Sequence, residues 1–198
     1  MKAAPMSDLA QQHLDALDLQ EGARPAAPKI EGATEDHIRA GRHLAAIHRH
    51  YLMDMARIAA VLRRIEAGDA PPVELRDIVL ATDMGENFRA FGSLCGQECR
   101  VLTMHHDIEQ ASMFPRLETA GGGVFAQIVA KLRAEHEVVH ELLVRLERAA
   151  MALMYDQTDA NFAQAAAIFR KLEAVIRSHF KYEETELAEA IGYYLGEI

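Results

Sequence analysis

The sequence predicts an all-α protein, an antiparallel up-down-up-down four-helix bundle with an N-terminal arm. Half of the 198 residues are hydrophobic, only 6% are aromatic and Trp is absent, a composition that favours helices. Four long segments carry apolar residues at helical spacing, and short turns rich in glycine, proline or aspartate separate them. Because each apolar stripe needs a partner, a bundle that buries all four is the expected arrangement.

The first 33 residues differ from the rest of the chain. They contain Pro5, Pro25 and Pro28 among alanine, glycine and charged residues. This composition predicts a flexible arm or linker over residues 1–33, in which residues 7–19 are compatible with a short helix. The bundle itself is expected to occupy residues 34–198.

Helix-ending signals divide the bundle into four helices. The first is predicted to begin near Thr34, whose hydroxyl can cap it, and to end near Gly68, before two prolines. Residues 73–81 add a helical turn or two. The other three helices are expected at residues 85–118, 124–155 and 160–190, with three glycines and then an aspartate-bounded turn between them.

Charge and composition exclude several classes of function. The net charge is −9 and no basic run occurs, which argues against nucleic acid as a partner. No stretch approaches 18 uninterrupted apolar residues and the first residues lack an apolar signal core, so a soluble, cytoplasmic protein without a membrane partner is expected. Cys95 and Cys99 do not form a disulfide framework. They are interpreted as small buried hydrophobic residues or as a redox pair.

Polar residues interrupt the apolar stripe of every predicted helix. The second helix has His105 and Glu109 one turn apart, followed along the same stripe by Ser112 and Arg116. The fourth helix repeats the spacing of a histidine and a glutamate one turn apart, with a second glutamate adjacent. The candidate metal ligands on the four stripes are His48, His105, Glu109, His136, His140, His179, Glu183 and Glu184.

Metal binding explains this set better than packing does. A single buried histidine is usually a hydrogen-bonded core residue. An unpaired carboxylate in a core, however, costs several kcal/mol, roughly, and two of them would need partners. Five imidazoles and two carboxylates exceed a tetrahedral zinc site and suit two metals that share the carboxylates. Imidazole-rich sites favour first-row metals such as iron over calcium or magnesium. A ferritin-like centre needs two E-x-x-H motifs, and only Glu137 with His140 matches.

Four segments of the chain, AIHRHYLMDMARI, HHDIEQASMFP, EHEVVHELL and HFKYEETEL, together resemble the hemerythrin-like (HHE cation-binding) family. The resemblance covers residues 34–191. It implies an up-down bundle around two non-haem iron ions with an oxo or hydroxo bridge. By position, the implied ligands are His136, His140 and His179 on one iron, His48 and His105 on the other, Glu109 as one bridging carboxylate, and Glu183 or Glu184 as the second.

Neighbouring residues have open roles. Helical geometry favours Glu183 over Glu184 as the second bridge, because Glu183 lies one turn after His179. Tyr51 follows His48 by three residues and is either a core residue or close to the metal. Glu98, one heptad before His105, is either a hydrogen-bond partner of a ligand or part of a salt bridge. His106 is interpreted as flanking the site rather than binding the metal.

The resemblance implies a protein that binds O2 or a related small ligand, for storage, sensing or stress protection. The alternatives are a di-iron enzyme that acts on peroxide or NO, a protein that handles or senses iron, and a scaffold that has lost its metal. The sequence leaves open the choice between iron, manganese and zinc. It also leaves open the oligomeric state and any protein partner.

Overall fold

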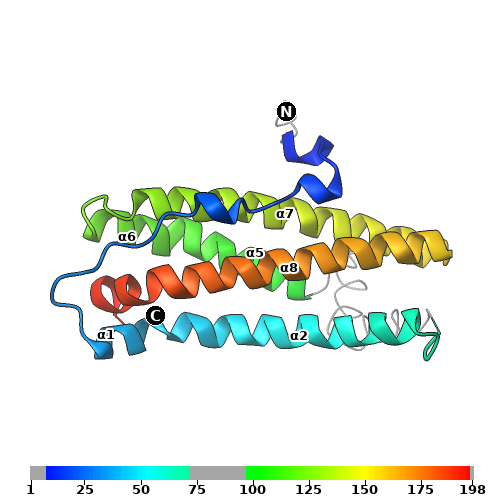
Figure 1. Cartoon of the computed structure of the whole chain (residues 1–198), viewed down its shortest axis with the longest axis horizontal. Coiled ribbons are helices and arrows are strands. Elements are labelled where there is room, and N and C mark those ends of the chain that lie inside the picture. Colours follow the sequence, from blue (N-terminus) through cyan, green and yellow to red (C-terminus); the bar gives the residue numbers. More distant parts are fainter. Residues whose placement is uncertain (1–7, 72–96, 197–198) are drawn as a thin grey trace.

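The computed structural model describes residues 8–71 and 97–196, and the side chains of 97–101 are not part of that description. Its described residues form helices joined by non-helical segments and contain no strand, which confirms the predicted all-α fold. Consecutive long helices run in opposite directions along the bundle (Figure 1). The four helical runs are α2 (His43–Glu66), α5 (Gln97–Ile108) continued by η4 (Glu109–Met113) and α6 (Phe114–Ala120), α7 (Ala126–Tyr155), and α8 (Asp159–Ala190).

The predicted first helix is interrupted after two turns. A short helix, α1 (Glu35–Gly41), precedes α2 and packs against the end of α8 and the π-helical segment η5 (Ile191–Leu195). Thr34 directly precedes α1, as predicted, and its backbone N–H donates to Nδ1 of His37 at 3.0 Å. The run ends with Gly68 in the left-handed region (φ +76°). Capping and glycine chemistry therefore fix both ends of this run near their predicted positions.

The second helical run changes pitch in the middle of the bundle. The five residues of η4 form a π-helix, whose wider turn shifts the residues that face the core. The sequence predicts Ser112 and Arg116 on the buried stripe, but both are exposed. Met113 and Leu117, one position later in each case, are buried instead. The prediction was wrong here because it assumed a regular α-helix.

The described part of the N-terminal arm packs on the bundle, which differs from the predicted flexible linker. It forms three short turns, η1 (Asp8–Gln11), η2 (Leu14–Ala16) and η3 (Glu21–Ala23), and then runs in extended form along α7 and α8 to α1 (Figure 1). Leu17 and Leu19 are fully buried in a core cluster with residues of α7 and α8. Burying each leucine side chain stabilises the folded state by about 1.5–3 kcal/mol. The composition of the arm alone does not reveal that these leucines are buried.

Some predictions fall on residues outside this description. Residues 73–81, Cys95 and the predicted start of the second helix near Gly85 lie outside the described residues, and the side chains of Glu98 and Cys99 lie outside the described side chains. Among residues 8–71 and 97–196, no helix has both the length and the apolar character needed to cross a membrane.

The crossing of α1 with η5 requires glycine, because a Cβ atom on Gly192 would lie 1.7 Å from the carbonyl oxygen of His37. We expect Gly192→Ala to destabilise the fold by about 1–3 kcal/mol, since neither backbone can move freely. Thermal unfolding measures this effect as a lower melting temperature. The control is Gly22→Ala in the arm, where a Cβ atom meets nothing within 4 Å. Equal melting temperatures for the two variants would contradict this close approach.

Candidate metal centre

Two groups of possible metal ligands meet in the buried middle of the bundle. One contains three histidines, His106, His136 and His179, and the other contains His48, His105, Glu109 and Glu183. Within each group the ligand atoms lie within 4.8 Å of one another, and all seven residues are buried. The ligands come from all four helical runs, so the centre exists only when the whole bundle is assembled.

Two carboxylates lie between the groups. Glu109 places Oε1 3.1 Å from Nε2 of His105 and Oε2 3.5 Å from Nε2 of His136. Oε2 of Glu183 lies 3.5 Å from Nε2 of His48 and 3.9 Å from Nε2 of His179. Each carboxylate therefore faces one imidazole of each group. Of the two adjacent glutamates in α8, Glu183 is therefore the one that lies among the imidazoles of both groups.

Most polar atoms of the two groups have no hydrogen-bond partner among the described residues; Nε2 of His48 and Nε2 of His105, which lie 3.1 Å apart, are among the exceptions. Both oxygens of Glu109, both oxygens of Glu183 and Nε2 of His179 are buried without a hydrogen-bond partner among the described residues. Nε2 of His106 and both nitrogens of His136 share this condition. Buried polar groups are normally paired, since each unpaired one is costly. Imidazole nitrogens and carboxylate oxygens are the donors that first-row divalent metals take.

Outer carboxylates orient two of the ligand rings. Nδ1 of His48 donates to Oε1 of Glu184 at 2.9 Å, and Nδ1 of His179 donates to Oε2 of Glu135 at 3.1 Å. These hydrogen bonds leave Nε2 of each ring facing the centre and raise its basicity as a ligand. Glu184, the alternative bridge, therefore lies behind a ligand and not between the two groups. Its side chain remains 34% exposed.

Aromatic rings line the ligands on their apolar sides. The ring of Phe180 stacks on His48 with centroids 3.7 Å apart and planes 2° apart. Phe114 packs on His136 at 5.5 Å, and Tyr51 lies 5.6 Å from the ring of His105. Tyr51 is thus a buried neighbour of the ligands. These rings keep water away from the donors and hold the imidazoles in place.

Burial sets the protonation of the ligands. Burial, reinforced by the imidazoles of His48 and His179, lowers the pKa of His105 to about 3. Burial and the imidazoles of His179 and His105 lower the pKa of His136 to about 2. For Glu109, burial and the nearby Glu183 raise the carboxyl pKa well above its ordinary value. The imidazoles of His105 and His136 are consequently neutral and ready to bind a cation, whereas the carboxyl of Glu109 must give up its proton first.

The structure places two histidines differently from the sequence prediction. His140 is exposed and belongs to neither group, because the buried stripe of α7 steps from His136 to Val139 and then to Leu143. His106, predicted only to flank the site, is 4% exposed and joins the three-histidine group. Its ring stacks on His136 with centroids 4.0 Å apart.

The sequence contains a feature that could have indicated His106 as a candidate ligand: it precedes Glu109 by three residues. Residues three and four apart share a helix face, so both His105 and His106 can face the same way as Glu109.

Comparison with known protein families agrees with this geometry. The sequence model of the hemerythrin HHE cation-binding domain matches residues 4–191, nearly the whole chain. The chain belongs to this family. No individual curated protein and no solved structure matched it. The match includes the N-terminal arm, so the hemerythrin-like domain extends beyond the residues 34–191 on which the sequence resemblance rested.

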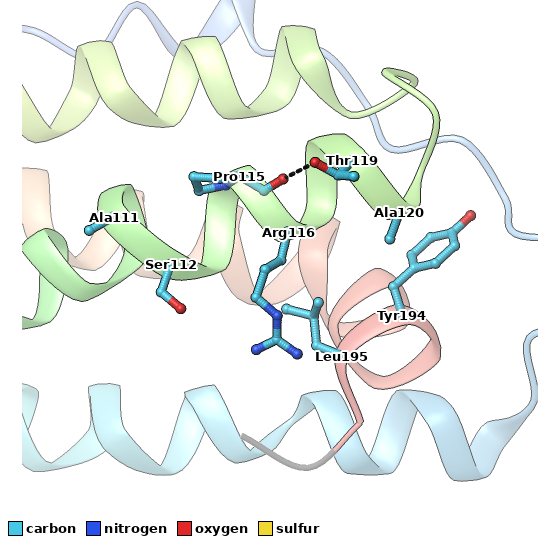
Figure 2. A pocket seen from close by; sticks show the side chains of 8 residues that line it. All are labelled: Ala111, Ser112, Pro115, Arg116, Thr119, Ala120, Tyr194 and Leu195. Atoms are coloured by element: carbon cyan, nitrogen blue, oxygen red, sulfur yellow. Dashed lines mark hydrogen bonds between the residues drawn. The ribbon is translucent and has the colours of Figure 1, made fainter.

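An open hollow on the surface of the hemerythrin-like domain lies apart from the ligand groups. It is bordered by η4 and α6 on one side and by the end of η5 on the other, and the side chain of Arg116 extends into it (Figure 2). Tyr194 and Leu195 line its far side, and Thr119 donates to the carbonyl oxygen of Pro115 at 2.8 Å. Neither ligand group contributes a residue to this hollow, so it is not the metal centre.

The positions of the two histidines give a direct test of the ligand set. We expect His106→Ala to lose at least one of the bound cations, because it removes one of three imidazoles from its group. His140→Ala is the matched control and should bind as wild type. Metal content after anaerobic loading and desalting measures both. Metal loss in His140→Ala, with full loading of His106→Ala, would contradict this assignment.

Protons should compete with the metal at the carboxylates. Since burial raises the pKa of Glu109 and of Glu183, both carboxyls hold protons above the ordinary carboxyl range when no metal is bound. Cation binding then releases protons, so the apparent affinity should rise with pH. Calorimetry in buffers of different ionisation enthalpy measures this release, and Glu109→Gln should release fewer protons. Metal uptake that releases none would refute the proton assignment.

Proposed function

We propose that this chain is a non-haem di-iron protein that binds O2 or a related small ligand. His106, His136 and His179 would hold one iron, and His48 with His105 would hold the other. Glu109 and Glu183 would bridge them. A pair of ferrous ions in such a site supplies the electrons that allow O2 to bind. The chain's own residues exclude water, orient the imidazoles and leave a place for the ligand.

The observation that carries this proposal is the position of the two buried carboxylates between the groups. Each contacts an imidazole of either group at 3.1–3.9 Å. A single cation would not explain why both carboxylates lie close to imidazoles of two separate groups. Five imidazoles also favour iron or another first-row metal over calcium or magnesium, which prefer oxygen ligands.

The two groups differ in their number of imidazoles, and this difference supports ligand binding at one of them. Three histidines serve one group and two serve the other. With both carboxylates shared, a cation held by His48 and His105 would have one protein ligand fewer, which favours binding of an external molecule at that position. The rings of Tyr51 and Phe180 lie beside His105, so that position is apolar and suits a small neutral ligand such as O2.

A second candidate function, an enzyme that acts on peroxide or NO, is favoured by one contact. Glu184 is partly exposed and accepts a hydrogen bond from His48. This pair links solvent to the side of the centre with fewer imidazoles. NO reduction consumes protons and peroxide disproportionation must move them between oxygen atoms, so both benefit from such a link, whereas reversible O2 binding does not need one. Glu184 is therefore the residue on which the two functions differ.

One experiment separates the candidates. The purified chain is loaded anaerobically with ferrous iron, assayed for metal and then cycled between argon and air while the visible spectrum is recorded. O2 binding predicts about two irons per chain and an absorption band that appears in air and disappears under argon. Evolution of O2 from added hydrogen peroxide, without a stable band, would indicate the enzyme instead. A folded chain that takes up no iron would exclude both.

Two adjacent glutamates supply the matched variants for this experiment. Glu183→Gln should lose iron, because it removes a bridging carboxylate. Glu184→Gln should keep both irons at saturating ferrous iron, because the amide oxygen of Gln can still accept the hydrogen bond from Nδ1 of His48. If Glu184→Gln leaves the reversible band unchanged, the chain needs no proton link and the O2-binding function is supported. Loss of peroxide turnover in the same variant would support the enzyme.

A further inference from the structure

The N-terminal arm reaches the back of the metal centre through one arginine. The guanidinium of Arg24 donates to both carboxylate oxygens of Glu135, from Nε at 2.8 Å and from Nη2 at 3.0 Å. Its third contact is Nη1 to Oγ of Ser178 at 2.9 Å. The side chain of Arg24 is only 12% exposed and that of Glu135 is 1% exposed. A two-point contact of this kind fixes the orientation of the carboxylate as well as its position.

Glu135 passes this orientation to a candidate ligand. Oε2, the oxygen that accepts from Nη2 of Arg24, also accepts from Nδ1 of His179 at 3.1 Å. The other ring nitrogen of His179 belongs to the three-histidine group and has no hydrogen-bond partner among the described residues. The arm is thus two hydrogen bonds away from a ligand nitrogen, although it contributes no ligand itself.

The arm also holds the helical turn that carries a bridging carboxylate. The guanidinium carbon of Arg24 lies 4.7 Å from the ring centre of Tyr182, and the hydroxyl of Tyr182 donates to the carbonyl oxygen of Pro25 at 2.7 Å. Tyr182 directly precedes Glu183 in α8. Two consecutive residues of the arm therefore contact α8 next to Glu183, while Arg24 reaches His179 through Glu135.

Glu135 depends on the arm for its charge balance. A buried carboxylate without a cationic partner is strongly unfavourable. Among the described residues, the other cation near Glu135 is Lys131, whose Nζ lies 3.8 Å from Oε1, beyond a good hydrogen bond, and donates to the carbonyl oxygen of Leu19 in the arm. If the arm detaches, Glu135 loses both of its charged hydrogen bonds, and the hydrogen bond from Nδ1 of His179 is left as the weaker restraint on its orientation.

From this juxtaposition we infer that Arg24 is a positioning residue for the metal centre, and that docking of the arm and binding of metal are thermodynamically coupled. The inference rests on the proposed metal site. Arg24 holds Glu135, Glu135 holds the ring of His179, and the cation takes the free nitrogen of that ring. Because coupling between two binding events is reciprocal, a bound metal holds the arm more firmly on the bundle, and a docked arm increases the affinity for metal.

Other contacts of the arm allow its general attachment to be separated from this role. Arg145 on α7 donates from Nη2 to the carbonyl oxygens of Leu9 and Gln12, both at 2.8 Å. It fastens the arm near η1 and has no contact with Glu135 or with either ligand group. Arg145→Gln is therefore the matched control for Arg24→Gln. Both variants replace an arginine by glutamine and weaken the contact between the arm and the bundle, but Arg145→Gln leaves Glu135 unchanged.

The test measures metal affinity and arm attachment in the full-length chain. Ferrous iron is titrated anaerobically against a chromophoric chelator with wild type, Arg24→Gln and Arg145→Gln. We expect Arg24→Gln to bind iron more weakly, by up to about the 10–100-fold loss typical of removing an outer partner of a ligand, because Arg24 acts through Glu135, and Arg145→Gln to bind as wild type. In limited proteolysis followed by mass spectrometry, iron should slow cleavage of residues 8–33 in wild type and should not do so in Arg24→Gln.

Each other outcome has a definite meaning. Equal iron affinity of Arg24→Gln and wild type overturns the inference, and so does an equal loss in both arginine variants, since that would show a general effect of arm attachment. If Arg24→Gln does not fold by circular dichroism, Arg24→Lys is measured, which keeps the charge and loses the two-point contact. An iron affinity of Arg24→Lys below that of wild type supports the inference, and wild-type affinity overturns it. A folded wild type that binds no iron refutes the proposed metal site itself.

Discussion

The rest of this structure depends on one constraint, the burial of two carboxylates and five imidazoles in the middle of a helical bundle. Their polar atoms find few partners among the described residues, and the unpaired ones converge on two points. A hydrophobic core gains nothing from such groups. Bound cations would supply the interactions that these buried polar groups lack. Part of the free energy that stabilises the assembled bundle would then come from metal binding.

Aromatic rings and outer carboxylates surround the candidate ligands and hold them in position. Phe114 and Phe180 pack on the faces of ligand rings and exclude water. Glu184 and Glu135 fix two imidazoles from behind. The two outer carboxylates differ in a way that bears on function. Glu184 faces solvent, whereas Glu135 is sealed beneath the arm by Arg24. One side of the centre is thus connected to the surface and the other is closed.

Much of the fold could be predicted because it follows from local chemistry. The helix boundaries near Thr34, Gly68 and residues 121–123 are set by capping and by glycine, which short sequence windows reveal. The candidate ligands on the stripes were visible because a buried carboxylate needs an explanation wherever it occurs. The arm could not be predicted in this way. Its polar, proline-containing composition is typical of a linker, and its attachment depends on long-range contacts such as that of Arg24 with Glu135.

The sequence by itself determined the fold class, the helical runs and six of the seven residues in the two ligand groups, because helical periodicity places His48, His105, Glu109, His136, His179 and Glu183 on buried stripes. Only the tertiary structure decided between His106 and His140, and between Glu183 and Glu184 as the carboxylate between the groups. The physical reason is that periodicity fixes which face of a helix a residue occupies to within about one position. The rotation of each helix against its neighbours, and the π-turn at Glu109–Met113, then decide which of two adjacent residues reaches the centre.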